Sequence, residues 1–395
     1  MAALRVFVLG ATGYIGSTFL DLLLRKESTS SLYTFRALVR SQEKADKDIR
    51  PQGIEPIIGS LNDVALIENE AANADIVINF ADADHLASTQ AILRGLSQRP
   101  RWEEGRRRPI LIHTSGTGVL LDGANGQFAS DTIYYDNDIT QLNTLKISQP
   151  HRIVDVEIID PALVGVIDTY IVAPPTIWGF GTGRGNTNSI QIPAQIANSL
   201  KHGQAMQIGK GLNIWSKVHV IDLAHFYISL LERTTQEPQD PNEVYPLGYP
   251  LPKNEDAYYF VQEGDDFAYG DVAKEIAKVF QGIGVNDSGA VNGTAPEEET
   301  AYWPEGSNGL LGGNSRSKAV KAREILGWEP KYTDFVGYIG EEIHRQKDLL
   351  DGKKPRHHQH QHQHQHQHHE QREHQGEGNQ GRHPQQIQQD IAPKW

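Results

Sequence analysis

The chain has 395 residues, enough for one large domain or two modest ones, and 38% of them are apolar. Its formal net charge of −13 argues against non-specific nucleic-acid binding, so we expect no nucleic-acid partner. The lack of cysteine excludes disulfides, cysteine-ligated zinc and a thiol nucleophile, and it fits a reducing compartment. Without a long apolar run or a signal-peptide pattern, we expect a cytoplasmic protein with no membrane partner.

The first predicted elements are a buried strand over residues 5–9 and a helix whose apolar pattern runs over residues 15–23. Between them lies the turn Gly10-Ala11-Thr12-Gly13-Tyr14-Ile15-Gly16. A strand, a glycine-rich turn and a helix are the context that a dinucleotide-binding fingerprint requires, because the helix N-terminus offers free N–H groups to phosphates. Gly10 would permit the tight turn, Gly13 the approach of a pyrophosphate, and Gly16 the close packing of helix and strand. A turn that serves packing alone is the alternative.

This turn resembles that of the extended short-chain dehydrogenase/reductase superfamily, which includes nucleotide-sugar epimerases and dehydratases. The resemblance implies an α/β fold of the Rossmann type, in which a doubly wound parallel sheet binds a nicotinamide dinucleotide. It also implies a smaller C-terminal substrate domain. All seven residues of the turn are then candidate cofactor contacts.

The second predicted strand, residues 34–39, is followed by Arg40 rather than by an acidic residue. In a dinucleotide fold an acid at this position binds the 2′-hydroxyl of NAD, whereas a cation suits the 2′-phosphate of NADP. We therefore expect NADP(H) rather than NAD(H), with Lys44 as a second cation; a surface arginine without a ligand is the alternative. A third strand, residues 54–59, precedes Asp63, which the resemblance places near the adenine and which could also cap the next helix.

The fourth predicted strand, residues 74–81, resembles the family pattern D-x-V-I-N-x-A-A, which implies that Ala81 lies beside the nicotinamide ribose. The next four residues, Asp82-Ala83-Asp84-His85, depart from the family pattern. His85 could reach the cofactor or the substrate, or it could form an ordinary surface hydrogen bond.

The fifth predicted strand and its exit, residues 109–118, resemble the family strand that ends in a hydroxyl-bearing residue. In the family this hydroxyl hydrogen-bonds the substrate oxygen during hydride transfer. We therefore predict Ser115 as a catalytic residue and Thr117 as a substrate contact. A hydroxyl that only caps the end of the strand is the alternative.

The proton-transfer motif of the family, Tyr-x-x-x-Lys on a helix, is missing. Its only formal match, at residues 249–253, contains two prolines and lies past the cofactor half, so we discard it. Residues 151–159 have a helical pattern and resemble the stretch that begins at the family lysine, so His151 takes the lysine position and Ile147 the tyrosine position. We predict that Tyr135 or His151 handles the proton instead, and loss of the pair without replacement is the alternative.

The resemblance returns in the second half of the chain. Residues 171–181 are similar to the family segment R-P-x-x-V-Y-G-P-G, which covers the nicotinamide, and this implies cofactor contacts for Pro174 and Ile177. Alanine replaces the arginine and tryptophan replaces the tyrosine of that segment. Two prolines and a glycine would also end a strand and close a turn without any ligand.

Two further segments resemble family motifs of the substrate side. Residues 214–224 are similar to W-x-x-V-H-V-x-D-L-A, where Trp215 is a candidate for the substrate pocket and Asp222 for a helix N-cap. Residues 314–330 are similar to a C-terminal motif whose arginine grips the diphosphate of sugar nucleotides, which makes Arg316 a candidate substrate contact.

We predict a dinucleotide-binding domain over residues 1–175, to which residues 216–238 return, and a substrate-binding part over residues 176–215 and 239–350. The tail from residue 351 is rich in histidine and glutamine and has few apolar residues, so we expect it to be disordered. Its histidines would bind Ni, Cu or Zn weakly, and we expect no physiological metal site.

The motifs together predict an NADP-dependent oxidoreductase or epimerase-like enzyme that acts on a small molecule with non-standard catalytic residues. They resemble fungal members that lack Tyr-x-x-x-Lys, some of which are encoded beside secondary-metabolite genes, and this implies a role in secondary metabolism. A homodimer is possible. The alternative is a catalytically impaired NADP-binding protein that acts as a sensor or scaffold.

Overall fold

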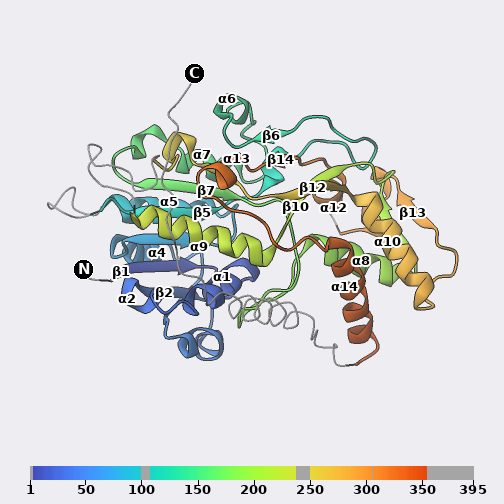
Figure 1. Ribbon diagram of the computed structural model, residues 1–395, viewed down its shortest axis with the longest axis horizontal. Coiled ribbons are helices and arrows are strands. Elements are labelled where there is room, and N and C mark those ends of the chain that lie inside the picture. Colours follow the sequence, from blue (N-terminus) through green and yellow to red (C-terminus); the bar gives the residue numbers. More distant parts are fainter. Residues whose placement is uncertain (1–2, 99–106, 237–249, 305, 354–395) are drawn as a thin grey trace, which may run out of the picture. The chain divides into compact units, whose positions relative to one another are not determined.

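The largest sheet of the computed structural model, which describes residues 3–98, 107–236, 250–304 and 306–353, has seven parallel strands (Figure 1). The strand order β11-β7-β5-β4-β1-β2-β3 is the doubly wound arrangement, with its switch point between β1 and β4. The predicted Rossmann-type α/β fold is therefore confirmed. The strands are β1 (Leu4–Leu9), β2 (Tyr33–Val39), β3 (Glu55–Ile58), β4 (Ile76–Asn79), β5 (Ile110–Thr114), β7 (Asp168–Ala173) and β11 (Tyr258–Phe260).

The central strands are buried on both sides, which explains their continuous apolar sequences. All four residues of β4 are buried, as are the last four of β1. This is expected for a parallel sheet with helices on both faces. Helix α1 packs beside α9, and α4 packs beside α5, which also contacts α7. These helices are α1 (Tyr14–Leu24), α4 (Val64–Ala72), α5 (Leu86–Ser97), α7 (Arg152–Ile158) and α9 (Val220–Gln236).

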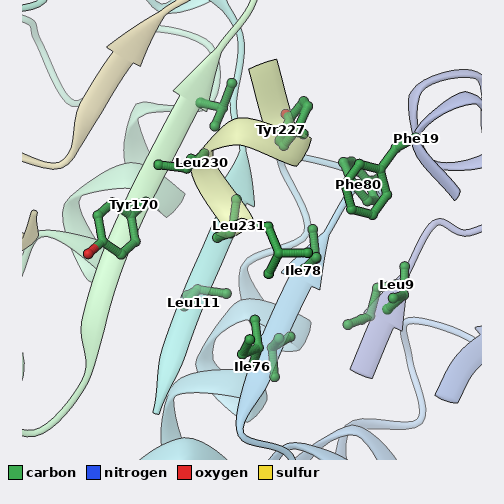
Figure 2. Packing of buried hydrophobic residues seen from close by; sticks show 14 of the residues in the cluster. Leu9, Phe19, Ile76, Ile78, Phe80, Leu111, Tyr170, Tyr227, Leu230 and Leu231 are labelled. Atoms are coloured by element: carbon green, nitrogen blue, oxygen red, sulfur yellow. The ribbon is translucent and has the colours of Figure 1, made fainter. Parts of the chain in front are cut away.

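The first hydrophobic core lies between this sheet and its helices (Figure 2). Aromatic rings from α1, from α9 and from the end of β4 meet there, with Phe80 4.9 Å from Tyr227 and 5.1 Å from Phe19 between ring centroids. Aliphatic side chains such as Leu9, Ile78, Leu111 and Leu231 fill the space around them. The core holds the carboxyl ends of β1, β4 and β5 in fixed positions, and these ends carry most of the predicted site residues.

A second core joins the elements that follow β7 in sequence. Trp178, Met206, Trp215, Tyr269 and Phe280 are buried in it. The small sheets are β12-β10-β8 and β13-β9, with β8 (Thr176–Trp178), β9 (Ala205–Ile208), β10 (Ile214–His219), β12 (Glu263–Ala268) and β13 (Val291–Thr294). The helices are α8 (Gln191–His202), α10 (Tyr269–Gly282), α11 (Glu299–Tyr302), α12 (Ser307–Gly312) and α14 (Phe335–Leu350).

Short strands and helices make up the rest of the described secondary structure. A two-stranded pair joins β6 (Tyr134–Tyr135) to β14 (Ser317–Lys318), far apart in sequence. The remaining short helices are α2 (Thr29–Leu32), α3 (Gln42–Lys44), α6 (Ile139–Leu142) and α13 (Val320–Glu324), with a π-helical turn over Ala45–Ile49. Turns of 3-10 helix lie at Arg50–Gln52, Thr117–Leu120, Pro161–Leu163, Asn254–Asp256 and Pro296–Glu298.

The chain groups into one compact unit over residues 1–344 and a second over residues 345–395. Of the second unit the structure describes the end of α14 and the residues up to 353, where Lys347 pairs with Asp351 at 3.2 Å. The predicted disordered tail lies outside the described residues beyond this point. Within the first unit the two cores use different stretches of sequence, and the first core also takes in Leu251–Val261 and Ala319–Trp328. The predicted domain boundaries stay a prediction.

Candidate active site

The glycine-rich turn follows β1 and leads directly into α1. Gly10 has a positive φ of 78°, and a Cβ there would lie 2.5 Å from the carbonyl carbon of Phe80. A Cβ on Gly16 would lie 2.4 Å from the carbonyl oxygen of Gly10. Both positions therefore require glycine, because a side chain would collide with backbone atoms. Gly13 is the N-cap of α1 and donates its N–H to Gly10 at 2.9 Å.

The start of α1 fits a bound anion. No side chain caps the helix, and its first turn has no acidic residue. The first N–H groups of a helix carry a partial positive charge and need acceptors, which a pyrophosphate would provide. The residues present therefore fit the phosphate end of a dinucleotide.

Arg40 and Asp63 lie beyond the strands that flank this turn. Arg40 is exposed and comes directly after β2, whose pairing of Leu38 with Leu9 brings it to the same sheet edge as the turn. Asp63 is the N-cap of α4, but its carboxylate turns back to Ser60, accepting the N–H at 2.6 Å and the hydroxyl at 2.9 Å. These two hydrogen bonds hold the pKa of Asp63 below its usual value.

The nicotinamide-side candidates lie around the ends of β4 and β7. The N–H of Ala81 donates to the side-chain oxygen of Asn79 at 3.0 Å. The carbonyl of Pro174 accepts the N–H of Thr117 at 2.9 Å, which ties the exit of β7 to the exit of β5. Ile177 belongs to β8 and packs against the first core.

A second glycine-rich loop, residues 179–188, rests against the cofactor turn. Asn186 donates its N–H to the carbonyl of Thr12 at 2.9 Å, and the hydroxyl of Ser17 donates to the carbonyl of Asn186 at 3.1 Å. The hydroxyl of Tyr14 donates to the carbonyl of Gly179 at 2.6 Å, and desolvation raises the pKa of Tyr14 well above its usual value. The turn and the loop therefore form one connected structure.

Ser115 lies at the exit of β5 and is buried. Its N–H donates to Val172 at 2.8 Å, and its hydroxyl donates to Oδ2 of Asp155 at 2.9 Å. The hydroxyl of Tyr258, on β11, donates to the same oxygen at 2.7 Å and accepts a bond from Arg152 at 2.8 Å. Behind the predicted serine there is thus a buried network, which we call the Asp155 network: Ser115, Arg152, Asp155 and Tyr258.

Asp155 is the titratable centre of that network. Its burial raises its pKa to about 6, against the lowering effect of hydrogen bonds from Tyr258 and Ser115. Its second oxygen, Oδ1, is buried and has no hydrogen-bond partner among the described residues. Burying an ionised carboxylate is costly when one of its oxygens lacks a hydrogen-bond donor, which agrees with the direction of this shift.

His151 is the N-cap of α7, the helix that carries Arg152 and Asp155 of the network. Its ring Nδ1 is 3.0 Å from Oδ1 of Asp84, and its backbone N–H donates to the same oxygen at 2.9 Å. Its Nε2 lies beside the glycines after β5: a Cβ on Gly116 would be 3.2 Å from it, and one on Gly118 would be 3.0 Å from it. The sequence-predicted candidates Ser115 and His151 are therefore brought together around Asp155 and the exit of β5.

The two positions that correspond to the proton-transfer pair, Ile147 and His151, do not lie on one helix. The predicted helix over residues 151–159 is α7, which covers Arg152–Ile158 with His151 as its N-cap, so Pro150 precedes the helix. Ile147 therefore lies outside the helix and is exposed. The physical reason is that proline disfavours the helical conformation in the residue before it, so the helix cannot extend backwards from residue 150.

The other predicted residues occupy different places. Tyr135 is 41% exposed on β6, beside Lys318 of β14, and no described contact joins it to Ser115 or His151. The hydroxyl of Thr117 is buried 2.9 Å from that of Ser315, whose backbone pairs with Trp215. Trp215 is buried and donates its indole N–H to Gly313 at 2.7 Å.

Arg316 and Asp222 make structural contacts. The guanidinium of Arg316 donates to Asp266 at 2.8 Å and to the carbonyl of Ser130 at 2.8 Å. Asp222 was expected at the N-cap of its helix, but α9 starts at Val220, because β10 runs into it without a loop. Its carboxylate instead accepts the N–H groups of Lys331 and Tyr332, both at 2.9 Å.

Sequence reasoning did not select Asp84, Asp155 or Tyr258 as functional residues. Asp84 lies in the four-residue stretch that departs from the family pattern, and this departure was its only local signal. Asp155 lies one helical turn after His151, a spacing that could have indicated it. No local signal marks Tyr258, which reaches the network from β11.

Two properties of the described ranges concern metals and membranes. No group of three or more histidine, aspartate or glutamate side chains there is arranged to hold a metal ion. No helix there combines the length and apolar character that crossing a membrane would need.

Comparison with known proteins identifies relatives of this chain. Residues 3–95 match the NmrA-like family. The oxidase ucsJ of an Acremonium species is 30% identical over 88% of this chain and 98% of its own length. An uncharacterised protein of Schizosaccharomyces pombe is 28% identical over 86% of this chain and 100% of its own.

Among solved structures, the dTDP-glucose 4,6-dehydratase DesIV of Streptomyces venezuelae, with NAD bound, has a TM-score of 0.60. It is 16% identical, and the match covers 89% of this chain and 99% of that one. This likeness shows the fold. The identity to the oxidase over nearly its whole length shows the family: the chain belongs to the extended short-chain dehydrogenase/reductase superfamily of NAD(P)-dependent oxidoreductases and epimerase-like enzymes.

Proposed function

We propose that this protein is an NADP(H)-dependent oxidoreductase or epimerase-like enzyme that acts on a small organic molecule. The proposal includes a substrate from secondary metabolism, which the resemblance to fungal members supports. The observation that carries it is the position of His151, whose Nε2 lies beside Gly116 and Gly118 at the exit of β5. In this superfamily the exit of that strand is where the substrate oxygen is expected.

The cofactor contacts are proposed from the placement of the candidate residues. The turn over residues 10–16 and the start of α1 would hold the pyrophosphate, because the helix N-terminus is uncapped. Arg40 would bind the 2′-phosphate of NADP and Asp63 would face the adenine. Ala81, Pro174 and Ile177 would border the nicotinamide, which supplies or accepts the hydride when it is bound.

The residues that would donate a proton to the substrate oxygen, or accept one from it, belong to this chain. His151 is the proposed acid and base, because its Nε2 lies beside Gly116 and Gly118 at the exit of β5. The tyrosine hydroxyls near that exit are already engaged in buried hydrogen bonds, that of Tyr227 with Thr114 and that of Tyr258 with Asp155. Ser115 keeps a proposed role through the Asp155 network, since its hydroxyl already donates to Asp155. Thr117, Trp215 and Arg316 remain proposed substrate-side residues.

The test is a titration of the full-length protein with NADPH and with NADH, in which nicotinamide fluorescence reports binding. We expect NADPH to bind more tightly than NADH. Arg40→Ala should weaken NADPH binding about tenfold or more, which is the scale of a lost charge-assisted hydrogen bond. The same variant should leave NADH binding unchanged. Lys318→Ala, a change of the same charge on β14, serves as the control. Equal affinity for both cofactors would contradict the NADP preference.

Turnover is tested separately, by NADPH oxidation with a panel of aldehydes and ketones. Oxidation that depends on His151 would support the enzyme. The protein could instead bind NADPH tightly but turn over neither any carbonyl compound of the panel nor, with NADP⁺, any of the corresponding alcohols. That result would favour the alternative of an NADP-binding sensor or scaffold protein. Binding of neither cofactor would contradict both.

A further inference from the structure

We propose that Asp84 positions His151, so that a carboxylate–imidazole pair acts at the site where the family uses tyrosine and lysine. The proposal rests on the proposed function for its catalytic meaning, but its geometry can be tested without a substrate. The two residues are 67 positions apart in sequence, and the contact forms because both flank the exit of β5. Asp84 is the positioning residue and His151 is the catalytic residue.

The first observation is that one oxygen of Asp84 receives two donors from the same residue. Its Oδ1 accepts the backbone N–H of His151 at 2.9 Å and lies 3.0 Å from Nδ1 of the ring. A carboxylate is only an acceptor when ionised, so Nδ1 must carry the proton in this contact. The other nitrogen, Nε2, then has a free lone pair when the ring is neutral, as a general base requires.

The second observation is the backbone of His151. Its φ is 65°, in the left-handed region that residues other than glycine seldom adopt. Such conformations are unfavourable and persist where the surrounding structure requires them, often at functional sites. In this conformation the backbone N–H and the ring of His151 both meet Oδ1 of Asp84. Asp84 is itself held by its N–H, which donates to Asp82 at 2.9 Å.

The third observation is the space around Nε2. Both positions closest to it on the β5 side are glycines, and a Cβ on Gly116 or Gly118 would approach it to 3.2 or 3.0 Å. Those separations are tighter than most real contacts of a Cβ atom, so the lack of side chains at the two glycines leaves room for the ring. The ring is partly accessible, with 22% of the His151 side chain exposed. Nε2 is therefore directed at the exit of β5 and not buried against a bulky side chain there.

The charged and titratable groups around His151 come from three elements. Asp155 and Arg152 belong to its own helix α7, and the charge of His151 lowers the pKa of Asp155. His113, on β5, is buried, and burial followed by the charge of His151 lowers its pKa to about 3. Asp84 comes from the segment after β4. His113 therefore stays neutral, and Asp84 is the carboxylate that directly contacts the ring.

The chemistry of the pair balances for either direction of the reaction. In a reduction, Nε2–H of the imidazolium would donate its proton to the substrate oxygen as the carbonyl π bond breaks, and a bound NADPH would supply the hydride for the new C–H bond. The products are an alcohol, a neutral imidazole and NADP⁺. In an oxidation, neutral Nε2 would accept the hydroxyl proton as the carbonyl π bond forms, and a bound NADP⁺ would accept the hydride. In both directions only Nε2 gains or loses the proton, while Nδ1–H keeps its hydrogen bond to Oδ1 of Asp84.

The substrate-free test is NMR of full-length protein labelled with ¹⁵N-histidine at a pH where the ring is neutral, with the His151 signals assigned by their absence in His151→Gln. We expect the Nδ1–H tautomer in the unmodified protein. Asp84→Ala should shift the signals towards the Nε2–H tautomer. Asp84→Asn should retain the tautomer, because the amide oxygen can still accept the Nδ1 proton. The control is Asp287→Asn, an exposed aspartate after α10, which should change nothing.

The catalytic test uses the carbonyl substrate selected from the panel. Asp84→Ala should lower kcat about a hundredfold, the scale of impaired acid–base catalysis, while KM and the Kd for NADPH change less than about threefold. The kcat of the Asp84→Asn variant should lie between that of Asp84→Ala and that of the unmodified protein. Since 56% of the Asp84 side chain is exposed, these variants should fold, which circular dichroism would verify.

The outcomes separate the two proposals. An Nε2–H tautomer in the unmodified protein, or signals that Asp84→Ala leaves unchanged, would overturn the pair even if the enzyme is active. An Asp84→Ala variant as active as the unmodified protein would also overturn it. No NADPH binding by the unmodified protein would instead overturn the proposed function, and the tautomer would still decide whether the pair exists.

Discussion

Asn186 donates its backbone N–H to the carbonyl oxygen of Thr12 at 2.9 Å, and this bond joins the second glycine-rich loop to the cofactor turn. The two residues come from different parts of the chain, one before α8 and one before α1. Two glycines of the loop make the approach possible, because a Cβ on Gly183 or Gly185 would lie 2.3 Å from backbone atoms of Ser17 or Thr12. The geometry of the turn therefore depends on the loop as well as on its own glycines.

We expect Gly185→Ala to weaken cofactor binding about tenfold or more. The new methyl group would meet the carbonyl of Thr12, a backbone atom that cannot rotate away, so the loop and the turn must separate. Nicotinamide fluorescence with NADPH measures the effect. Gly123→Ala is the matched control, since a Cβ there has no neighbour within 4 Å. Equal affinity in both variants would show that the loop does not support the turn.

For Ser115→Ala we expect a fall in turnover of at least about tenfold, the scale of one lost catalytic hydrogen bond. The variant also removes one of the two hydroxyl donors to the buried Oδ2 of Asp155, so the free energy of unfolding should fall by about 1–3 kcal/mol. Steady-state kinetics and urea denaturation measure the two effects. Unchanged turnover together with reduced stability would assign Ser115 a structural role only.

The stability of the protein should contain a contribution from Asp155 that depends on pH. Burial raises the pKa of Asp155 to about 6 in the folded protein, above its unfolded value of about 3.9. The folded state therefore binds more protons than the unfolded state between these values. The contribution favours folding below about pH 4 and is lost as the pH rises through about 6, a change of about 3 kcal/mol for the full shift.

Asp155→Asn should remove this contribution. The difference in the free energy of unfolding between the unmodified protein and the variant should change between pH 4 and 6 and be constant above about pH 7. Urea denaturation at a series of pH values gives this difference. Asp138→Asn, which changes an exposed residue, is the control for the loss of one charge. A difference that is the same at every pH would contradict the raised pKa.

Much of the fold could be predicted from local sequence. The apolar runs of β1, β2, β4 and β5 indicated strands because buried parallel strands need apolar residues on both sides. The turn at residues 10–16 could be recognised because its glycines meet steric needs that are set within one strand–turn–helix unit. The helical pattern after residue 151 was also correct, with α7 over Arg152–Ile158.

The arrangement of the candidate site depended on contacts between distant residues. Asp84 meets His151 across 67 positions, and Tyr258 meets Asp155 across 103. No residue spacing encodes such contacts, since they arise when separate strands end at the same edge of the sheet. The sequence by itself determined the fold class, the glycine turn and the loss of Tyr-x-x-x-Lys, because these are local properties. Only the tertiary structure decided that His151 faces a carboxylate and that Ser115 faces a buried one, because side-chain partners follow from packing.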